Sequence, residues 1–275
     1  MKQGEHNSVS STLFSADNTQ PRHDMHNRWP RAESVDDFRN NLQAVRQRIQ
    51  NACLRSGRVA SDVRLLPVSK TMDEAHIRLA CQAGCDFLGE NKVQEAWLKS
   101  QAMSDLTDLK WSVIGHLQTN KAKLVAKFAS ELQALDSLHT AEALDRRLQA
   151  EGRALDVFVQ INTSHEPSKY GLHPDDAEVF LQQLAPFSSL RVKGLMTLAE
   201  FTQDAARVRA CFIRLRTLRD RLCDRAPAGI IPSQLSMGMS GDFEIAIEEG
   251  ATVVRVGQSI FGARNLSDDH FWPAQ

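Results

Sequence analysis

The chain has 275 residues, of which 42% are hydrophobic and 24% are charged, with a formal net charge of -1 at pH 7. This composition allows a large buried core and excludes a chain that is disordered throughout. It also excludes a global field that would attract nucleic acid or anionic lipid, so we expect neither as a partner.

Cysteine content and hydropathy indicate the compartment. Five cysteines are too few, and odd in number, for a disulfide framework in a chain of this length. Cys81 and Cys85 are interpreted as packing residues on one helix face, and no metal site is expected. The N-terminus lacks the apolar core of a signal peptide, and no run of about 18 apolar residues occurs. We therefore expect a cytoplasmic protein without membrane contact.

In chain order, residues 1–33 are predicted to be a disordered polar extension, because no apolar period could bury a face. Phe38, Leu42 and Val45 then fall at helical spacing, which predicts a helix from Ser34 to about Ser56. The next apolar runs are 63–69, 87–88, 111–115, 132–135, 157–162, 192–198, 234–237 and 252–256. Helical stretches are predicted near 73–83, 91–103, 119–129, 140–151, 174–185, 203–225 and 241–249.

This alternation predicts an α/β fold. Each helical stretch is long enough to cross back over a sheet, which makes consecutive strands parallel. Eight repeats favour a single (β/α)8 TIM barrel over residues 34–266 with an extra N-terminal helix, followed by a tail at 267–275. A flavodoxin-like or Rossmann sheet is the alternative, because two of the runs are short.

Polar residues follow the predicted strands, where barrels carry their chemistry. Lys70 leaves the first apolar run, so we expect a poorly solvated amine that can act as a nucleophile. The alternative is a rim lysine paired with Glu90. The last two runs lead into loops rich in glycine and serine, which in these barrels often hold phosphate. The alternative there is an ordinary capped turn.

A nucleophilic amine, an anion site and an arginine between them match the needs of pyridoxal 5′-phosphate. Lys70 would take the aldehyde, and Arg255 would meet the pyridine nitrogen. A permanently charged donor at that position keeps the nitrogen unprotonated, which makes the ring a poor electron sink. The alternative for Arg255 is a salt bridge to Glu248 or Glu249.

Motifs over residues 34–264 support this interpretation. They are VSKT at 68–71, FLGENKVQE at 87–95, IGHLQTNK at 114–121, QINTS at 160–164, LSMGMS at 235–240, RVG at 255–257 and FGAR at 261–264. Together they resemble the pyridoxal phosphate homeostasis protein family. The resemblance implies a barrel similar to the N-terminal domain of alanine racemase, with pyridoxal 5′-phosphate held as a Schiff base on Lys70.

The resemblance also implies the positions of the other cofactor contacts. Asn91 is expected to approach the ring and Arg255 to face its nitrogen. The residues expected around the phosphate are Ser236, Ser240, Gly257 and Gln258. Gln258 stands where the family commonly has Thr, so its backbone N–H is the expected donor. Two further departures are Ser112 in place of His and Tyr170 in place of Phe.

The implied function is participation in intracellular pyridoxal phosphate homeostasis without substantial amino-acid turnover, as a monomer that supplies pyridoxal-phosphate-dependent enzymes. A racemase would need a second base from a separate domain, whereas Tyr170 is the only tyrosine and the sequence stops soon after the last run. Whether the protein is an enzyme stays open. The alternative is a racemase or another weak enzyme pairing Lys70 with His116 or Tyr170. A third possibility is a barrel that binds phosphorylated metabolites without forming an imine.

Overall fold

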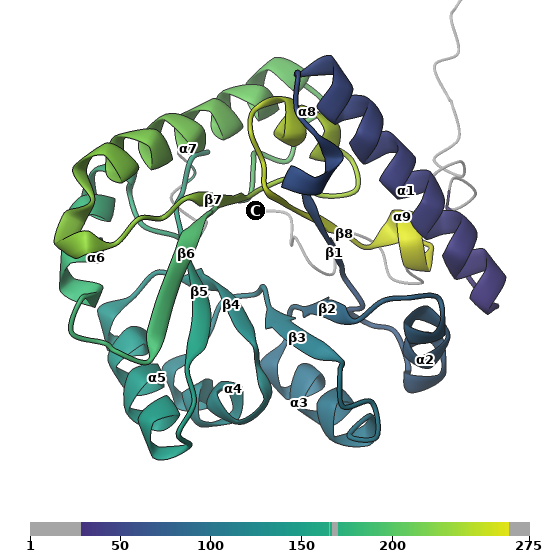
Figure 1. The fold of residues 1–275 in the computed structure, drawn as a ribbon, viewed down its shortest axis with the longest axis horizontal. Coiled ribbons are helices and arrows are strands. Elements are labelled where there is room, and N and C mark those ends of the chain that lie inside the picture. The colour runs from purple at the N-terminus through teal and green to yellow at the C-terminus, as the bar shows by residue number, and fades with distance from the viewer. Residues whose placement is uncertain (1–28, 165, 167–169, 264–275) are drawn as a thin grey trace, which may run out of the picture.

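The computed structural model describes residues 29–164, 166 and 170–263 (Figure 1). Most of the predicted polar extension and the whole predicted tail at 267–275 lie outside the described residues. Two backbone hydrogen bonds attach the segment from Trp29 to Glu33 to the barrel. The N–H of Ala263 donates to the Trp29 carbonyl at 2.8 Å, and the N–H of Ala32 donates to the Phe261 carbonyl at 3.3 Å.

The first helix, α1 (Val35–Arg55), confirms the helix predicted over residues 34–56. Its start is fixed by a capping box: the Ser34 hydroxyl accepts the N–H of Asp37, and the Asp37 carboxylate accepts the N–H of Ser34. The helix packs against α2, α8 and α9 through an apolar face with residues at helical spacing, namely Phe38, Leu42, Val45, Ile49, Ala52 and Cys53.

Eight parallel strands form a single sheet. They are β1 (Arg64–Pro67), β2 (Phe87–Glu90), β3 (Lys110–Val113), β4 (Glu131–Leu135), β5 (Leu155–Gln160), β6 (Leu190–Met196), β7 (Gln234–Ser236) and β8 (Val253–Val256). Their order in space is β1-β8-β7-β6-β5-β4-β3-β2. A parallel bridge between Val68 and Gly89 connects the two outermost strands, β1 and β2. The sheet is therefore a nearly closed barrel, which confirms the predicted (β/α)8 fold and excludes the flavodoxin-like alternative.

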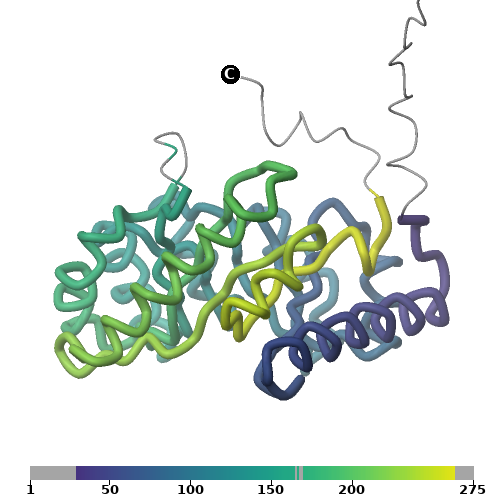
Figure 2. Tube along the Cα trace, turned by 90° about the horizontal axis from the view of Figure 1, so that it is seen from above, coloured from purple at the N-terminus to yellow at the C-terminus, as the bar shows by residue number. Residues whose placement is uncertain are grey.

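Helices surround the strands on the outside of the barrel (Figure 1). After α1 they are α2 (Glu74–Gln82), α3 (Val93–Ala102), α4 (Ala122–Phe128), α5 (Leu138–Ala150), α6 (Ala177–Leu184), α7 (Ala205–Arg225), α8 (Phe243–Glu248) and α9 (Gln258–Phe261). Because the strands contact helices outside and side chains inside, β4 is buried along its whole length. The two ends of the described chain lie on the same side of the barrel as the loop after β5 (Figure 2).

The prediction that Cys81 and Cys85 share one helix face is wrong for Cys85. Cys81 lies in α2, but the helix ends at Gln82, and Gly84 turns the chain with a φ of 102° before Cys85. Burial raises the pKa of the Cys81 thiol to about 11 and that of the Cys85 thiol to about 12. Both thiols are therefore protonated and act as packing groups.

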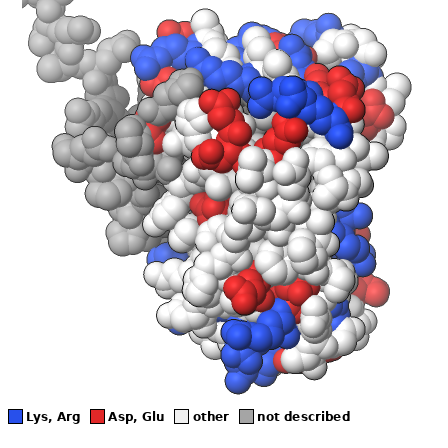
Figure 3. Space-filling view, turned by 90° about the vertical axis from the view of Figure 1, so that its left-hand side faces the viewer, with Lys and Arg blue, Asp and Glu red and all other residues white. Residues whose placement is uncertain are grey.

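The surface does not gather charge of one sign on the side seen in Figure 3. Acidic and basic side chains lie next to one another near both ends of this side, and its centre is mostly uncharged. None of the helices in the described part of the chain combines the length and apolar character needed to cross a membrane.

Candidate functional site

All carboxyl ends of the strands lie at one rim of the barrel because the strands are parallel. Four strands that are neighbours in the sheet, β2, β1, β8 and β7, carry the predicted site residues. Along the rim these are Asn91 after β2, Lys70 after β1, Arg255, Gly257 and Gln258 at the end of β8, and Ser236 and Ser240 at the end of β7. The fold thus brings seven residues, scattered over the sequence from 70 to 258, to one arc of the rim.

Lys70 is held by strands on both sides. The N–H of Val68 donates to the Val256 carbonyl of β8 at 2.9 Å, and the N–H of Ser69 donates to the Gly89 carbonyl of β2 at 3.0 Å. Lys70 is half-buried. Thr71, which follows it, has a φ of 69°, a left-handed conformation that is unusual for a β-branched residue and costs about 1–3 kcal/mol. Strain of this size directly after the predicted nucleophile shows that the backbone there is constrained by its surroundings.

A buried charged cluster lies around Ser69 and Thr71. Lys99, in α3, donates to the Ser69 carbonyl at 3.0 Å, to Oε1 of Glu90 at 2.8 Å and to Oε1 of Glu95 at 2.6 Å. Oε1 of Glu90 also accepts from the Ser69 hydroxyl at 2.6 Å, and Oε1 of Glu95 accepts the N–H of Thr71 at 2.9 Å. Burial raises the pKa of Glu90, although Lys99 opposes this effect. Oε1 of Glu90 is thus bonded to both Lys99 and Ser69.

Arg255 enters the barrel interior from β8 and is 3% exposed. Its Nη1 donates to the Ser236 hydroxyl at 2.6 Å, and its Nη2 donates to the Thr197 carbonyl at 2.9 Å. Burial lowers its pKa to about 10, and the charges of Asp242 and Glu131 oppose this effect. Arg255 is therefore a cation at neutral pH, held by neutral acceptors.

The alternative salt bridge from Arg255 to Glu248 or Glu249 is wrong. These two carboxylates lie on the outside of the barrel and pair with arginines of α1 and α7, with contacts of 2.6 to 2.9 Å to Arg55, Arg209 and Arg216. Arg255 instead belongs to a chain of buried polar side chains that crosses the interior.

This interior chain continues from Ser236. The Ser236 hydroxyl donates to Oε1 of Gln133 at 2.6 Å, and Nε2 of Gln133 donates to Oε1 of Glu131 at 2.6 Å. Glu131 also accepts from the Ser112 hydroxyl at 2.7 Å and from Arg64 at 2.6 Å. Ser112 is thus part of this interior chain. The hydroxyl of Ser236, which is 0% exposed, is fully engaged within it.

The loop after β7 meets the end of β8. The N–H of Gly257 donates to the Ser240 hydroxyl at 3.2 Å, and the N–H of Arg255 donates to the Gly238 carbonyl at 3.0 Å. Gly238 has a φ of 94°, and a Cβ atom there would lie 2.6 Å from Cβ of Ala246. A Cβ at Gly257 would lie 3.1 Å from the Val68 carbonyl oxygen. Gly238 therefore lets the loop after β7 pack closely on α8, and Gly257 lets the end of β8 approach Val68, two residues before Lys70.

Asn91 fits against Gly115, which follows β3. A Cβ atom at position 115 would lie 2.1 Å from the backbone carbonyl oxygen of Asn91 and 2.5 Å from its side-chain oxygen. Only glycine leaves room for Asn91 in this place. Its predicted position on the same arc as Lys70 thus depends on a residue 24 positions away in the sequence.

His116 and Tyr170 lie on the opposite arc of the rim. Their rings stack in parallel with centroids 3.9 Å apart, and Nδ1 of His116 lies 3.8 Å from Oδ2 of Asp136. The N–H of Gly171 donates to Oδ2 of Asp136 at 3.1 Å. Burial raises the pKa of Asp136, and the nearby His116 opposes this effect. Tyr170 is 60% exposed, so it is a side chain of the rim surface.

The donor groups present fit pyridoxal 5′-phosphate, the group that the sequence implies. Its aldehyde matches the amine of Lys70, and its ring nitrogen matches a charged donor such as Arg255. Its phosphate matches the hydroxyl of Ser240 and the backbone N–H groups near Gly257, where a side chain would close the space.

Sequence reasoning missed three residues of this site: Lys99, Glu95 and Gln133. Glu95 and Lys99 are four positions apart in a helix that begins directly after β2, a spacing that signals an ion pair. Gln133 carried no comparable signal, because its contact with Ser236 joins strands that are not neighbours in the sheet.

Comparison with known proteins gives consistent matches. Residues 34–265 match the family model described as the alanine racemase N-terminal domain. The chain is 39% identical over 223 residues to the pyridoxal phosphate homeostasis protein of Aquifex aeolicus, covering 81% of this chain and 96% of that protein. It is 40% identical over 225 residues to the protein of the same name from Pseudomonas aeruginosa, covering 82% of this chain and 95% of that one.

Solved structures agree with these matches. The structure of PipY from Synechococcus elongatus with pyridoxal phosphate bound has a TM-score of 0.71 and 36% identity, covering 82% of this chain and 100% of that chain. An alanine racemase from Corynebacterium glutamicum has a TM-score of 0.61 at 16% identity, covering 85% of this chain and 64% of that chain. The second likeness concerns the fold alone.

Proposed function

The chain belongs to the pyridoxal phosphate homeostasis protein family, and we propose that it binds pyridoxal 5′-phosphate as a Schiff base on Lys70. In this proposal it takes part in intracellular pyridoxal phosphate homeostasis without substantial amino-acid turnover. It acts as a monomer that supplies pyridoxal-phosphate-dependent enzymes.

The observation that carries the proposal is the pairing of β1 with β8. Leu66 pairs with Arg255 and Pro67 with Val256, so the strand that ends in the amine and the strand that carries the guanidinium are neighbours. When bound, pyridoxal 5′-phosphate supplies an aldehyde carbon, and the Lys70 nitrogen forms a C=N bond to it with release of water. The chain's own contribution is to deliver an amine at the edge of a poorly solvated interior.

Arg255 and Ser236 act together in this proposal. Arg255 stays protonated at neutral pH despite its lowered pKa of about 10, so it donates a hydrogen bond to the ring nitrogen and keeps that nitrogen unprotonated. Ser236 and Gln133 orient the guanidinium, because the Ser236 hydroxyl accepts from Arg255. We therefore assign Ser236 to Arg255 and leave the phosphate to Ser240, Gly257 and Gln258.

A low capacity for amino-acid turnover follows from the same contacts. An unprotonated ring withdraws electrons weakly, so a proton on the α-carbon of an amino acid would be lost slowly. The candidate second bases are His116 and Tyr170, and their rings stack on each other with centroids 3.9 Å apart. Asn91 and the loop from Gly238 to Ser240 are expected to hold the ring and the phosphate.

The test is absorbance of the purified protein in the imine band after addition of pyridoxal 5′-phosphate. We expect the band in the unmodified protein and its loss in Lys70→Ala. Lys92→Ala is the matched control, because Lys92 is an exposed lysine close to the same rim, after β2. An unchanged band in Lys70→Ala would contradict the proposal.

The enzymatic alternative has its own readout. Deuterium exchange at the α-carbon of alanine or serine, dependent on Lys70, would be measurable in a racemase or a related weak enzyme. We expect no exchange above the rate of free pyridoxal 5′-phosphate. Exchange that is lost in His116→Ala or Tyr170→Phe would assign the second base and overturn the proposed lack of turnover.

A further inference from the structure

We propose that Lys99, together with Glu90 and Glu95, is the positioning device for Lys70: the three side chains lock the backbone on both sides of the amine-bearing residue. The inference rests on the proposed function, because it concerns how Lys70 is presented to an aldehyde. It adds three residues that do not touch the ligand to the account of the site.

The contacts are directed at the two peptide units that flank Lys70. On one side, Ser69 is held through its carbonyl by Lys99 and through its hydroxyl by Glu90. On the other side, the N–H of Thr71 is held by Glu95 at 2.9 Å. Lys99 bonds both carboxylates, so its three ammonium donors tie the two sides into one unit.

The conformation of Thr71 shows why such a lock is needed. A left-handed β-branched residue relaxes unless its surroundings hold it, and its φ is 69°. Its N–H is the atom that the Glu95 carboxylate fixes. Release of that hydrogen bond would let the turn relax and would change the direction in which Lys70 leaves β1.

A gain in stability over an apolar core does not explain why this cluster is charged. Lys99 is 10% exposed and Glu90 is 0% exposed, and buried ion pairs of this kind are often no more stable than apolar residues of the same volume. Within the described part of the chain, Oε2 of Glu90 has no hydrogen-bond partner, whereas Oε1 accepts two. The donors converge on the oxygen that holds Ser69, which indicates a role in geometry.

The experiment separates positioning from binding. The rate of imine formation with pyridoxal 5′-phosphate is followed by absorbance. In parallel, the Kd for pyridoxamine 5′-phosphate is measured, because this ligand has the same ring and phosphate but no aldehyde. We expect Lys99→Met and Glu95→Ala to slow imine formation by about 10- to 100-fold, with the Kd for pyridoxamine 5′-phosphate changed by less than about two-fold.

Conservative variants sharpen the test. Glu95→Gln retains an oxygen that can accept the N–H of Thr71, so we expect it to recover most of the rate lost in Glu95→Ala. Arg58→Met is the matched control: Arg58 donates to the carbonyls of Ile247 and Ala251 at 2.8 Å each, at the amino end of β8. It should change neither readout.

The outcomes are distinguishable. If Lys99→Met does not fold, the comparison of Glu95→Ala with Glu95→Gln decides. Imine formation at the unmodified rate in Glu95→Ala, or an equal loss of rate and of pyridoxamine 5′-phosphate affinity, would overturn the positioning role and leave the proposed function intact. If the unmodified protein forms no imine, the proposed function falls and this inference falls with it.

Discussion

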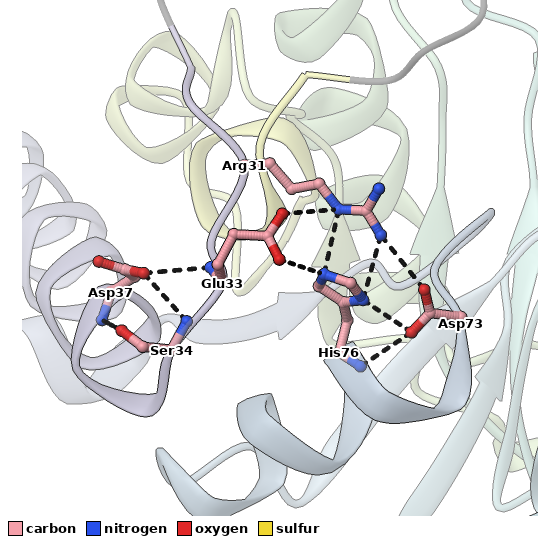
Figure 4. A network of polar contacts seen from close by, with 6 residues as sticks. All are labelled: Arg31, Glu33, Ser34, Asp37, Asp73 and His76. Atoms are coloured by element: carbon pink, nitrogen blue, oxygen red, sulfur yellow. Dashed lines mark hydrogen bonds and ion pairs between the residues drawn. The ribbon is translucent and has the colours of Figure 1, made fainter.

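Two polar networks flank the turn after β1, a buried one between the end of β2 and helix α3, called the inner network, and a more exposed one at the start of α2, called the outer network. The inner network consists of Lys99, Glu90 and Glu95, and the outer network of Arg31, Glu33, Asp73 and His76 (Figure 4). In the outer network, Arg31 lies 3.2 Å from Asp73, and His76 lies between the carboxylates of Asp73 and Glu33.

The two networks differ in solvent exposure more than in chemistry. Side chains of the inner network are 0 to 30% exposed, whereas Arg31, Asp73 and Glu33 are 36 to 65% exposed, and of the outer network only His76 is mostly covered, at 13%. A buried charge that loses its partner keeps a desolvation penalty, while an exposed one is re-solvated by water. Networks of similar size, on two sides of one turn, should therefore differ widely in their effect on the protein.

The largest expected effect is that of Lys99→Met on stability. Removal of the cation leaves Glu90 buried without its charged partner, and the free energy of unfolding should fall by about 3–5 kcal/mol. Urea denaturation measures this value. Adding Glu90→Gln to the same chain should recover part of the loss. A loss below about 1 kcal/mol would show that the inner network behaves like an exposed one.

Gly115→Ala tests how closely Asn91 packs against Gly115 at the rim of the barrel. The new Cβ would lie 2.1 Å from the Asn91 carbonyl oxygen, so we expect a loss of about 1–3 kcal/mol in the free energy of unfolding. The matched control is Gly241→Ala, because a Cβ there meets no atom within 4 Å. Equal stability of the two variants would contradict the close approach of Asn91.

The pH dependence of stability should have opposite signs for Glu90 of the inner network and Asp73 of the outer network. Burial raises the pKa of Glu90, so its folded state binds more protons than its unfolded state. Its contribution is present below the unfolded pKa of about 4.3 and is lost as pH rises through the folded pKa. The N–H and the ring of His76 lower the pKa of Asp73, so its contribution is lost as pH falls below about 4.

The free energy of unfolding, measured at a series of pH values between about pH 3 and pH 8, tests this contrast between Glu90 and Asp73. Glu90→Gln should flatten the decline toward neutral pH, and Asp73→Asn should flatten the decline toward acid pH. A Glu90→Gln variant that parallels the unmodified chain at every pH would show that burial does not raise the pKa of Glu90.

The smallest expected effect is that of Arg31→Met. Because the outer network is exposed, its loss should lower the free energy of unfolding by less than about 1 kcal/mol. Raising the salt concentration should shrink this difference further, since mobile ions screen exposed charges. Denaturation at low and high salt measures both. A loss as large as that of Lys99→Met would remove the distinction between the two networks.

Local sequence patterns predicted the fold because the elements that define it are locally encoded. The α1 cap needs only Ser34 and Asp37, and the strand that leads to Lys70 is a single apolar run. Lys70, Arg255 and Gly257 were predicted to share one site, and parallel strands in the observed order place them on one arc.

Side-chain partners across the barrel could not be predicted in the same way. Ser236 contacts Gln133, 103 positions away, because β4 and β7 face each other across the interior. The alternative partners of Arg255, Glu248 and Glu249, were wrong for the same reason, since they are close in sequence but lie outside the barrel. Partners of this kind depend on strand order and register, which no local pattern contains.

The central claim is that the amine of Lys70 forms the imine with pyridoxal 5′-phosphate. Borohydride reduction of the protein mixed with pyridoxal 5′-phosphate, followed by mass spectrometry of the peptides, locates any imine. The account predicts one pyridoxyl adduct on the peptide that contains Lys70, and none on the peptide that contains Lys99. An adduct only on other lysines, or none at all, would contradict it.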